Sequence, residues 1–243
     1  MGKMSSTQAR REIGDFNKAH VDKRSLMLAY FSHISYHSLA RTKRVLERDG
    51  AVNVTTFNKG GTQAFLAEFD DFAVLTFRGT EYSVWRDIWT DLQCWTKKFH
   101  GINVHYGFAK ALEKVLPQVS NSLDMVRGKK IYFTGHSLGG ALAQLMALEY
   151  NPECVLTFGA PRVSGGHKFE QFFNYIDFHR VVSSWDVVPH LPPRIPFWGY
   201  KHVGIPTGIR SYSKMPLKAH SMFNYMGGVS DYLKDKKHNI CEH

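Results

Sequence analysis

A serine between two glycines is the part of this sequence best suited to chemistry. Ser137 has Gly135 two positions before it and Gly139 two positions after it. The β-branched and aromatic residues 131–134 come before it and the alanine- and leucine-rich residues 141–148 follow, so we predict a strand, a tight turn and a helix. The turn strains the serine backbone, and the glycines avoid Cβ clashes. The hydroxyl then stands above the sheet edge, at a helix N-terminus that favours negative charge.

The same Gly-x-Ser-x-Gly pattern also occurs in ordinary strand-to-helix loops. A catalytic role for Ser137 therefore depends on finding the residues that would act with it. A serine hydroxyl is a weak nucleophile near neutral pH and needs a histidine to take its proton and a carboxylate to orient that histidine. We predict Asp186 as the acid, because it follows the expected strand at residues 178–185 and catalytic groups gather at the carboxyl ends of such strands. Asp177 precedes this strand and would lie at the opposite edge.

The histidine must come from late in the chain. His220 follows the loop 214–219 and precedes an expected helix, so we predict it as the base. His202 is its main rival, but it lies in a segment that resembles a strand. Three further histidines are weaker candidates: His190, His238 and His243.

The reaction of a serine nucleophile also needs donors for a developing oxyanion. The amide of Leu138, directly after the serine, is one candidate. Thr80 is the other, because it follows the apolar strand at residues 73–77 and offers an amide and a hydroxyl.

The elements around these residues indicate an α/β fold. Residues 52–57, 63–69 and 72–77 read as strands joined by short turns, which makes them antiparallel. Later strands alternate with helices, which predicts a mostly parallel central sheet with helices on both faces. We expect one domain over residues 1–243, with residues 1–46 as an N-terminal helical segment.

The net charge and residue composition of the chain limit the classes of partner that it could bind. The chain has 243 residues, a formal net charge of +10 and a pI near 9.5. Such a charge attracts polyanions, but the basic residues are spread out and no nucleic-acid motif is present, so contact with an anionic membrane is the better hypothesis and nucleic acid is not expected. His33 and His37 share a helical face without a third ligand nearby, and we predict neither a metal nor a cofactor.

An apolar stripe at near-helical spacing follows Thr80. It consists of Val84, Trp85, Ile88, Trp89, Leu92 and Trp95, and four of these are the candidate lipid contacts: Trp85, Ile88, Trp89 and Leu92. The stripe fits a helix that faces the core. It also fits a segment that touches lipid, because several tryptophans lie together with lysines beside them. The sequence leaves both interpretations open.

Seven motifs together resemble the class 3, fungal-type lipases of the α/β-hydrolase fold, over about residues 51–225. They are Phe77-Arg78-Gly79-Thr80, Asp87-Ile88-Trp89-Thr90-Asp91-Leu92, Val104-His105-Tyr106-Gly107-Phe108, Thr134-Gly135-His136-Ser137-Leu138-Gly139-Gly140, Phe158-Gly159-Ala160-Pro161-Arg162-Val163, Arg180-Val181-Val182 with Asp186-Val187-Val188-Pro189, and Tyr200-Lys201-His202-Val203-Gly204.

The resemblance implies a carboxylic ester hydrolase acting on lipids, as a triacylglycerol lipase or a phospholipase A. It implies the same catalytic serine, acid and base and the same oxyanion donors, and it places the family's lid after Thr80. Two alternatives stay open: an esterase for soluble esters resembling feruloyl esterases, and a catalytically silent interaction module. Secreted members of the family carry a signal peptide and disulfides. This chain has neither pattern, so we expect a cytoplasmic protein or one exported without a signal peptide.

Overall fold

A seven-stranded sheet forms the centre of the computed structural model, which describes residues 21–80, 95–194 and 199–240. The strand order is β1-β2-β3-β6-β7-β8-β9. The strands are β1 (Asn53–Lys59), β2 (Thr62–Glu68), β3 (Phe72–Phe77), β6 (Lys130–His136), β7 (Cys154–Phe158), β8 (Asp177–Ser183) and β9 (Ile205–Ile209).

The sheet is antiparallel at one side and parallel elsewhere. β1, β2 and β3 pair antiparallel through short turns, whereas β3, β6, β7, β8 and β9 run parallel to one another. Phe77 of β3 pairs with Gly135 of β6, and His136 of β6 pairs with Phe158 of β7. The carboxyl ends of the parallel strands therefore meet at one edge, which is where such sheets bind ligands.

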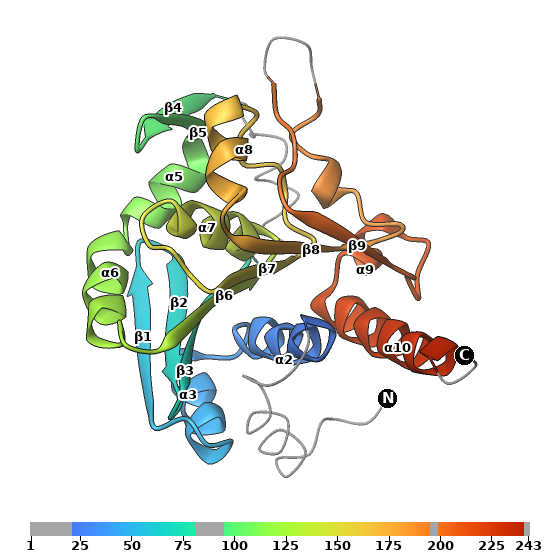
Figure 1. Cartoon of the computed structure of the whole chain (residues 1–243), viewed down its shortest axis with the longest axis horizontal. Helices are drawn as coiled ribbons and strands as arrows, with labels where there is room; N and C mark the ends of the chain where they lie inside the picture. Colours follow the sequence, from blue (N-terminus) through green and yellow to red (C-terminus); the bar gives the residue numbers. More distant parts are fainter. Residues whose placement is uncertain (1–20, 81–94, 195–198, 241–243) are drawn as a thin grey trace.

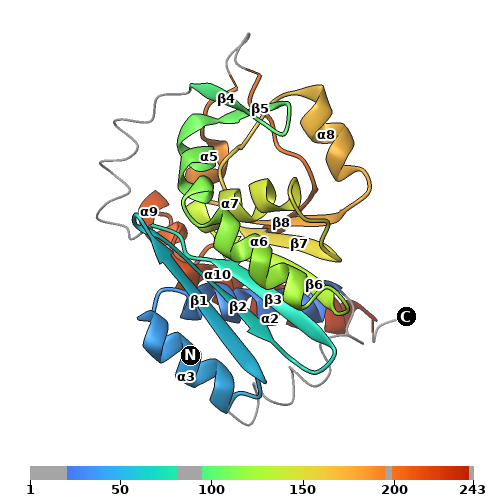
Figure 2. The same cartoon turned by 90° about the vertical axis from the view of Figure 1, so that its left-hand side faces the viewer.

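Helices cover both faces of the sheet (Figures 1 and 2). One face carries α2 (Val21–Ile34), α3 (Leu39–Arg48) and α10 (Met222–Ile240). The other carries α5 (Tyr106–Glu113), α6 (Leu116–Met125), α7 (Leu138–Ala147) and α8 (His167–Phe173). The predicted fold class, a mostly parallel sheet between two helical layers, is confirmed.

Two apolar cores lie between these layers because successive side chains of a strand point to opposite faces. In β6, Ile131 and Phe133 pack toward the α5–α8 layer, while Tyr132 packs toward α2 and α10. Phe133 is fully buried, and burial of a side chain of this kind contributes roughly 1.5–3 kcal/mol. Apolar side chains therefore pack against both faces of β6 just before Ser137.

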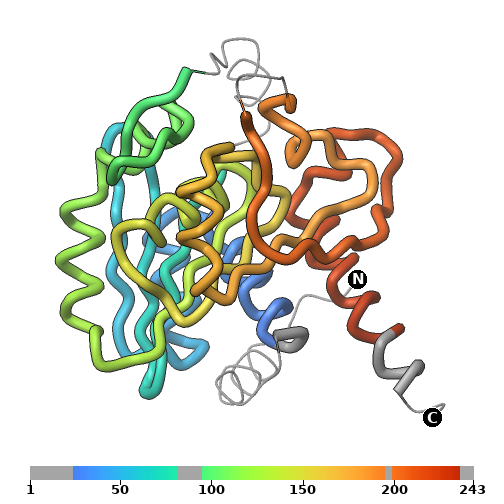
Figure 3. The backbone as a smooth tube through the Cα atoms, turned by 45° about the horizontal axis from the view of Figure 1, so that its top comes forward, coloured from blue at the N-terminus to red at the C-terminus, as the bar shows by residue number. Residues whose placement is uncertain are grey.

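The segments that follow β8 gather on one side of the molecule, where Figure 3 draws them in orange and red. After β8 comes the short helix η2 (Val188–His190), and after β9 comes α9 (Pro216–Ala219), which leads into α10. In Figures 1 and 3 these segments lie on the opposite side of the molecule from α6. None of the helices in the described ranges is both long and apolar enough to cross a bilayer.

Several boundaries differ from the sequence-based expectations. The strand predicted to end at residue 185 ends at Ser183, and α3 continues two residues past 46. Residues 200–204 form no strand; Lys201 makes an isolated bridge with Ser164, and the ladder starts at Ile205. An antiparallel hairpin, β4 (Thr96–Phe99) and β5 (Ile102–His105), was not expected, because β4 follows directly on residues assigned to a helical stripe.

Candidate active site

Ser137 lies at a sharp turn between β6 and α7. Its φ is 62° and its ψ is −127°, a conformation that costs a residue with a side chain about 1–3 kcal/mol. A Cβ on Gly135 would come within 2.3 Å of the Gly139 carbonyl carbon, and one on Gly139 within 2.1 Å of the Phe77 carbonyl oxygen. The two glycines are therefore required because backbone passes directly over these positions, as the sequence pattern predicted.

The structure brings the three predicted catalytic side chains together. Ser137 Oγ lies 2.6 Å from His220 Nε2, and His220 Nδ1 lies 2.7 Å from Asp186 Oδ2. A carboxylate only accepts hydrogen bonds, so Nδ1 carries a hydrogen and Nε2 is left to accept the serine proton. All three residues are buried. This is the geometry that a serine nucleophile requires, and the catalytic roles stay predictions.

Two further donors hold the carboxylate of Asp186. Its Oδ1 accepts the Val188 amide at 2.9 Å, and its Oδ2 also accepts the Tyr225 hydroxyl at 2.5 Å. The same hydroxyl accepts the Ser183 amide at 3.1 Å. Burial and the neighbouring carboxylate raise the pKa of Tyr225 well above its ordinary value, so the phenol stays protonated and donates.

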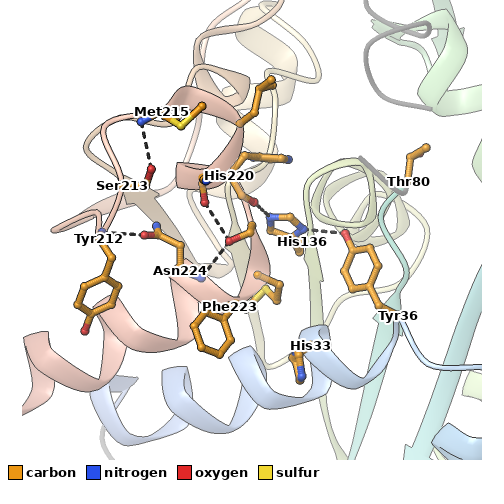
Figure 4. Close-up of a pocket in the computed structure, with 14 residues that line it drawn as sticks. His33, Tyr36, Thr80, His136, Tyr212, Ser213, Met215, His220, Phe223 and Asn224 are labelled. Atoms are coloured by element: carbon orange, nitrogen blue, oxygen red, sulfur yellow. Dashed lines mark hydrogen bonds between the residues drawn. The ribbon is translucent and has the colours of Figure 1, made fainter. Parts of the chain in front are cut away.

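His220 is positioned through its backbone as well as its ring. It ends α9, and Asn224 of α10 donates from Nδ2 to the Ala219 carbonyl and to Ser183 Oγ, both at 2.9 Å. His136 donates from Nε2 to the His220 carbonyl at 2.6 Å (Figure 4). The residue next to the serine thus holds the loop that carries the base.

Tyr36 supports His136 from the N-terminal helical segment. Its hydroxyl donates to His136 Nδ1 at 2.7 Å, as Figure 4 shows. Burial, followed by the charge of His220, lowers the pKa of His136 well below its ordinary value, so the imidazole is neutral and can donate at one nitrogen while it accepts at the other. Arg78 lies over the Tyr36 ring, 5.7 Å from its centroid.

Sequence reasoning missed these three supporting residues, Tyr36, His136 and Tyr225. The spacing of Met222, Tyr225 and Val229 marks a buried helical face, but it does not indicate that a hydroxyl on that face reaches Asp186. His136 stood next to the serine and could have been suspected. No local signal distinguishes Tyr36 from an ordinary core tyrosine.

The predicted oxyanion donors face one cavity. Thr80 and Leu138 both line a cavity of about 300 Å³ beside the serine turn. Leu138 is the first residue of α7, where backbone amides have no partner within the helix. Thr80 and Leu138 thus lie near each other at the serine turn, and their role as oxyanion donors stays a prediction.

A second, larger cavity adjoins the base. It measures about 780 Å³, and His136, His220 and Thr80 contribute to its wall. The rest of the wall comes from His33 and Tyr36 and from residues 212–224, which include Met215, Met222 and Phe223. Figure 4 labels most of these side chains. Cavities of this size and apolar character accept drug-sized organic ligands.

The other sequence-based candidates have different positions. His202 donates from Nε2 to the Pro189 carbonyl at 2.5 Å, and burial lowers its pKa to about 3, so it is a neutral structural residue. His33 and His37 contact each other at 5.9 Å between ring centroids. The predicted lid residues lie in residues 81–94, outside the described ranges, so their contact with lipid stays a prediction; they are Trp85, Ile88, Trp89 and Leu92.

Comparisons of the sequence and of the structure with known proteins both find lipases. The family model for lipase (class 3) matches residues 74–195, half of the chain. A lipase from Rhizopus niveus is 33% identical over 184 residues, which cover 67% of this chain and 46% of that protein. Phospholipase A1-II 6 from Oryza sativa subsp. japonica is 33% identical over 148 residues, covering 49% and 36%. The chain thus spans less than half the length of these relatives.

Among solved structures, a triacylglycerol lipase whose catalytic centre is described as a serine protease triad matches with a TM-score of 0.65. It is 26% identical, and the match covers 80% of this chain and 82% of that one. A TM-score of this size over about four-fifths of both chains shows that the two proteins share one fold. On the family model, the fold and the Ser-His-Asp geometry together, this protein belongs to the class 3 lipase family, with the α/β-hydrolase fold.

Proposed function

We propose that the protein hydrolyses carboxylic esters of lipids through an acyl-enzyme. The observation that carries this proposal is the unbroken line of hydrogen bonds from Ser137 to His220 to Asp186 at a buried sheet edge. Relatives named lipase and phospholipase A1 support the choice of lipid esters, and so does the apolar cavity beside the base.

Each step of the reaction has a residue to perform it. Ser137 Oγ bonds to the ester carbonyl carbon while its proton passes to His220 Nε2, and Asp186 stabilises the imidazolium. Leu138 and Thr80 stabilise the oxyanion, and His220 gives the proton to the departing alcohol as the carbon–oxygen bond breaks. Water then attacks the acyl-enzyme by the same route and releases the fatty acid.

A fluorophosphonate probe tests this proposal. The probe phosphonylates an activated serine, so we expect one label, on Ser137, and none on the Ser137→Ala protein. Asp186→Asn keeps the size of the side chain and should slow labelling strongly, because the imidazole loses the carboxylate that orients it. A folded protein that takes no label would favour the alternative of a catalytically silent interaction module.

A second experiment distinguishes lipid esters from soluble esters as substrates. We propose lipid esters over soluble esters of the feruloyl type because Met215, Met222 and Phe223 make the cavity wall apolar. Lipid analysis of membranes exposed to the wild-type and Ser137→Ala proteins should show loss of acylglycerols or phospholipids with the wild type alone. Turnover of short soluble esters without any change in lipids would favour the esterase.

The formal net charge of +10 further supports peripheral contact with an anionic membrane. A protein with this charge would meet its substrate at a lipid surface.

A further inference from the structure

Two arginines and a histidine lie together outside the catalytic triad. Arg162 follows β7, Arg180 belongs to β8 and His202 precedes β9, so the three come from neighbouring strands of the sheet. Ser164 and Lys201 form a bridge, which places the segments that carry Arg162 and His202 side by side. We call Arg162, Arg180 and His202 the basic cluster. After the larger effect of burial, the charges of both arginines lower the pKa of His202, so the three groups act on one another.

The basic cluster holds the loop at the end of η2, but part of its hydrogen-bonding capacity is unused. Arg162 donates from Nη1 to two carbonyls within residues 189–192, and His202 donates from Nε2 to a third. Three other nitrogens are buried and have no hydrogen-bond partner within the described ranges: Arg162 Nε, Arg180 Nε and His202 Nδ1. Buried polar atoms in folded proteins are nearly always paired, so a site with three unpaired nitrogens indicates a missing ligand.

The positive charge of the basic cluster has no counter-ion among the described residues. Arg162 is only 8% exposed, and no described carboxylate lies at ion-pair distance from it or from Arg180. The carboxylate of Glu170 is taken by Lys201, the neighbour of His202. Burial, followed by the charge of Arg162, lowers the pKa of Arg180 to about 10. Because buried cations without a partner are costly, an anion bound between them would stabilise the fold.

The three unpaired nitrogens differ in what they require of such an anion. A guanidinium group only donates hydrogen bonds, and its planar fork matches the oxygens of an oxyanion. His202 is neutral and carries its hydrogen on Nε2, so its Nδ1 can only accept. The ion must therefore accept from Arg162 and Arg180 and donate to His202. Hydrogenphosphate can do both, whereas sulfate, chloride and ionised carboxylates have no hydrogen to donate.

We propose that the basic cluster binds inorganic hydrogenphosphate as a structural counter-ion. Arg180 and His202 are partly exposed, so a small ion can enter from solvent and reach the more deeply buried Arg162. The bound ion would offset the repulsion between the two guanidinium groups and stabilise the loop that Arg162 and His202 hold. The proposal goes beyond the proposed function, uses none of the catalytic residues and does not depend on ester hydrolysis.

Inorganic phosphate tests the proposal with two measurements near neutral pH. Isothermal titration calorimetry should show saturable binding of phosphate to the wild-type protein. Sulfate should bind at least about tenfold more weakly, because one hydrogen bond is lost. The thermal midpoint should rise by about 3 °C or more in saturating phosphate, relative to sodium chloride of equal ionic strength.

Three variants locate the effect. Arg180→Met removes a guanidinium that no hydrogen bond joins to another described residue. Without phosphate its midpoint should equal or exceed that of the wild type, since the repulsion from Arg162 disappears, and its phosphate-dependent rise should vanish. His202→Gln keeps a donor for the Pro189 carbonyl and loses the Nδ1 acceptor, so it should bind phosphate and sulfate equally. Arg44→Met removes the same charge from the exposed surface of α3 and should keep the wild-type response.

Circular dichroism establishes that each variant is folded, and Arg180→Gln replaces Arg180→Met if the latter does not fold. The proposal is overturned if the wild type binds no phosphate, if it binds sulfate as tightly as phosphate, or if Arg180→Met keeps the full rise in midpoint. A rise of the same size in all four proteins would be the general stabilising effect of phosphate salts and would equally overturn it. Failure of the hydrolase proposal would appear separately, as absent fluorophosphonate labelling of the wild type.

Discussion

The hydroxyl of Tyr225 provides a sharp test of how the acid is held. Tyr225→Phe removes a single oxygen from a fully buried side chain and leaves the ring in place. That oxygen donates to Asp186 Oδ2 at 2.5 Å and accepts the Ser183 amide at 3.1 Å. Asp186 then keeps only the Val188 amide to fix its orientation toward His220.

Both lost bonds affect stability. A hydrogen bond to a charged group contributes roughly 1.5–3 kcal/mol, and a buried amide left without a partner costs about 1–3 kcal/mol. We therefore expect the free energy of unfolding to fall by about 3 kcal/mol. The catalytic effect is smaller, because the hydrogen bond between His220 and Asp186 survives and only its alignment is weakened. A loss of about 2 kcal/mol in the transition state would lower kcat roughly 30-fold.

A second tyrosine supplies the control. Tyr30 is also buried, and its hydroxyl donates to Asp49 Oδ2 at 2.6 Å, far from the serine in the α2–α3 layer. Tyr30→Phe removes only a bond to a carboxylate, so it should lower stability by roughly 1.5–3 kcal/mol with kcat unchanged. The assays are urea unfolding and hydrolysis of a short soluble ester, with kcat and KM measured separately.

The two variants together decide the interpretation. If Tyr225→Phe lowers stability and leaves kcat at the wild-type value, the hydroxyl is structural and does not position the acid. If both variants lower kcat to the same extent, the effect is a general consequence of destabilisation. An unchanged stability of Tyr225→Phe would contradict the hydrogen bonds themselves.

Three other changes test separate parts of the structure. Gly139→Ala places a Cβ 2.1 Å from the Phe77 carbonyl oxygen and should lower the free energy of unfolding by about 3 kcal/mol, whereas Gly128→Ala, with open space around it, should change it little; urea unfolding measures both. Burial lowers the pKa of His105 from 6.5 to about 4, so between these pH values only the unfolded state binds the proton and stability falls as pH falls. His105→Asn should therefore reduce the slope of the free energy of unfolding against pH by up to about 1.4 kcal/mol per pH unit between pH 6.5 and 4. Urea unfolding at several pH values measures this slope. An unaltered slope would show that the ring is protonated in the folded protein. Trp89→Ser should blunt the rise in activity above the solubility limit of a lipid ester while a short soluble ester is still hydrolysed, and equal losses on the two substrates would indicate a core role for the tryptophan.

Most of the sheet could be predicted because its signals are local. The strands around residues 54–57, 63–68 and 72–77 alternate or are continuously apolar between short turns, and β7 coincides with an apolar run from Cys154 to Phe158. The hairpin at residues 96–105 and the absence of a strand at residues 200–204 were missed. Both depend on distant partners: His105 bonds Val163 through its amide, and Lys201 pairs with Ser164.

The sequence alone determined the serine turn, since Gly135, Ser137 and Gly139 are close in the chain and their spacing reflects backbone contacts within a few residues. It also placed the acid Asp186 shortly after β8, because the hydrophobic pattern locates a strand to within a few residues even where its exact end, here Ser183, differs. The tertiary structure decided which histidine meets the serine and which groups hold it. His220 and Ser137 are 83 positions apart, and Tyr36 and His136 are 100 apart. Such pairs are set by how layers of helices pack on the sheet, and no spacing within the chain records that packing.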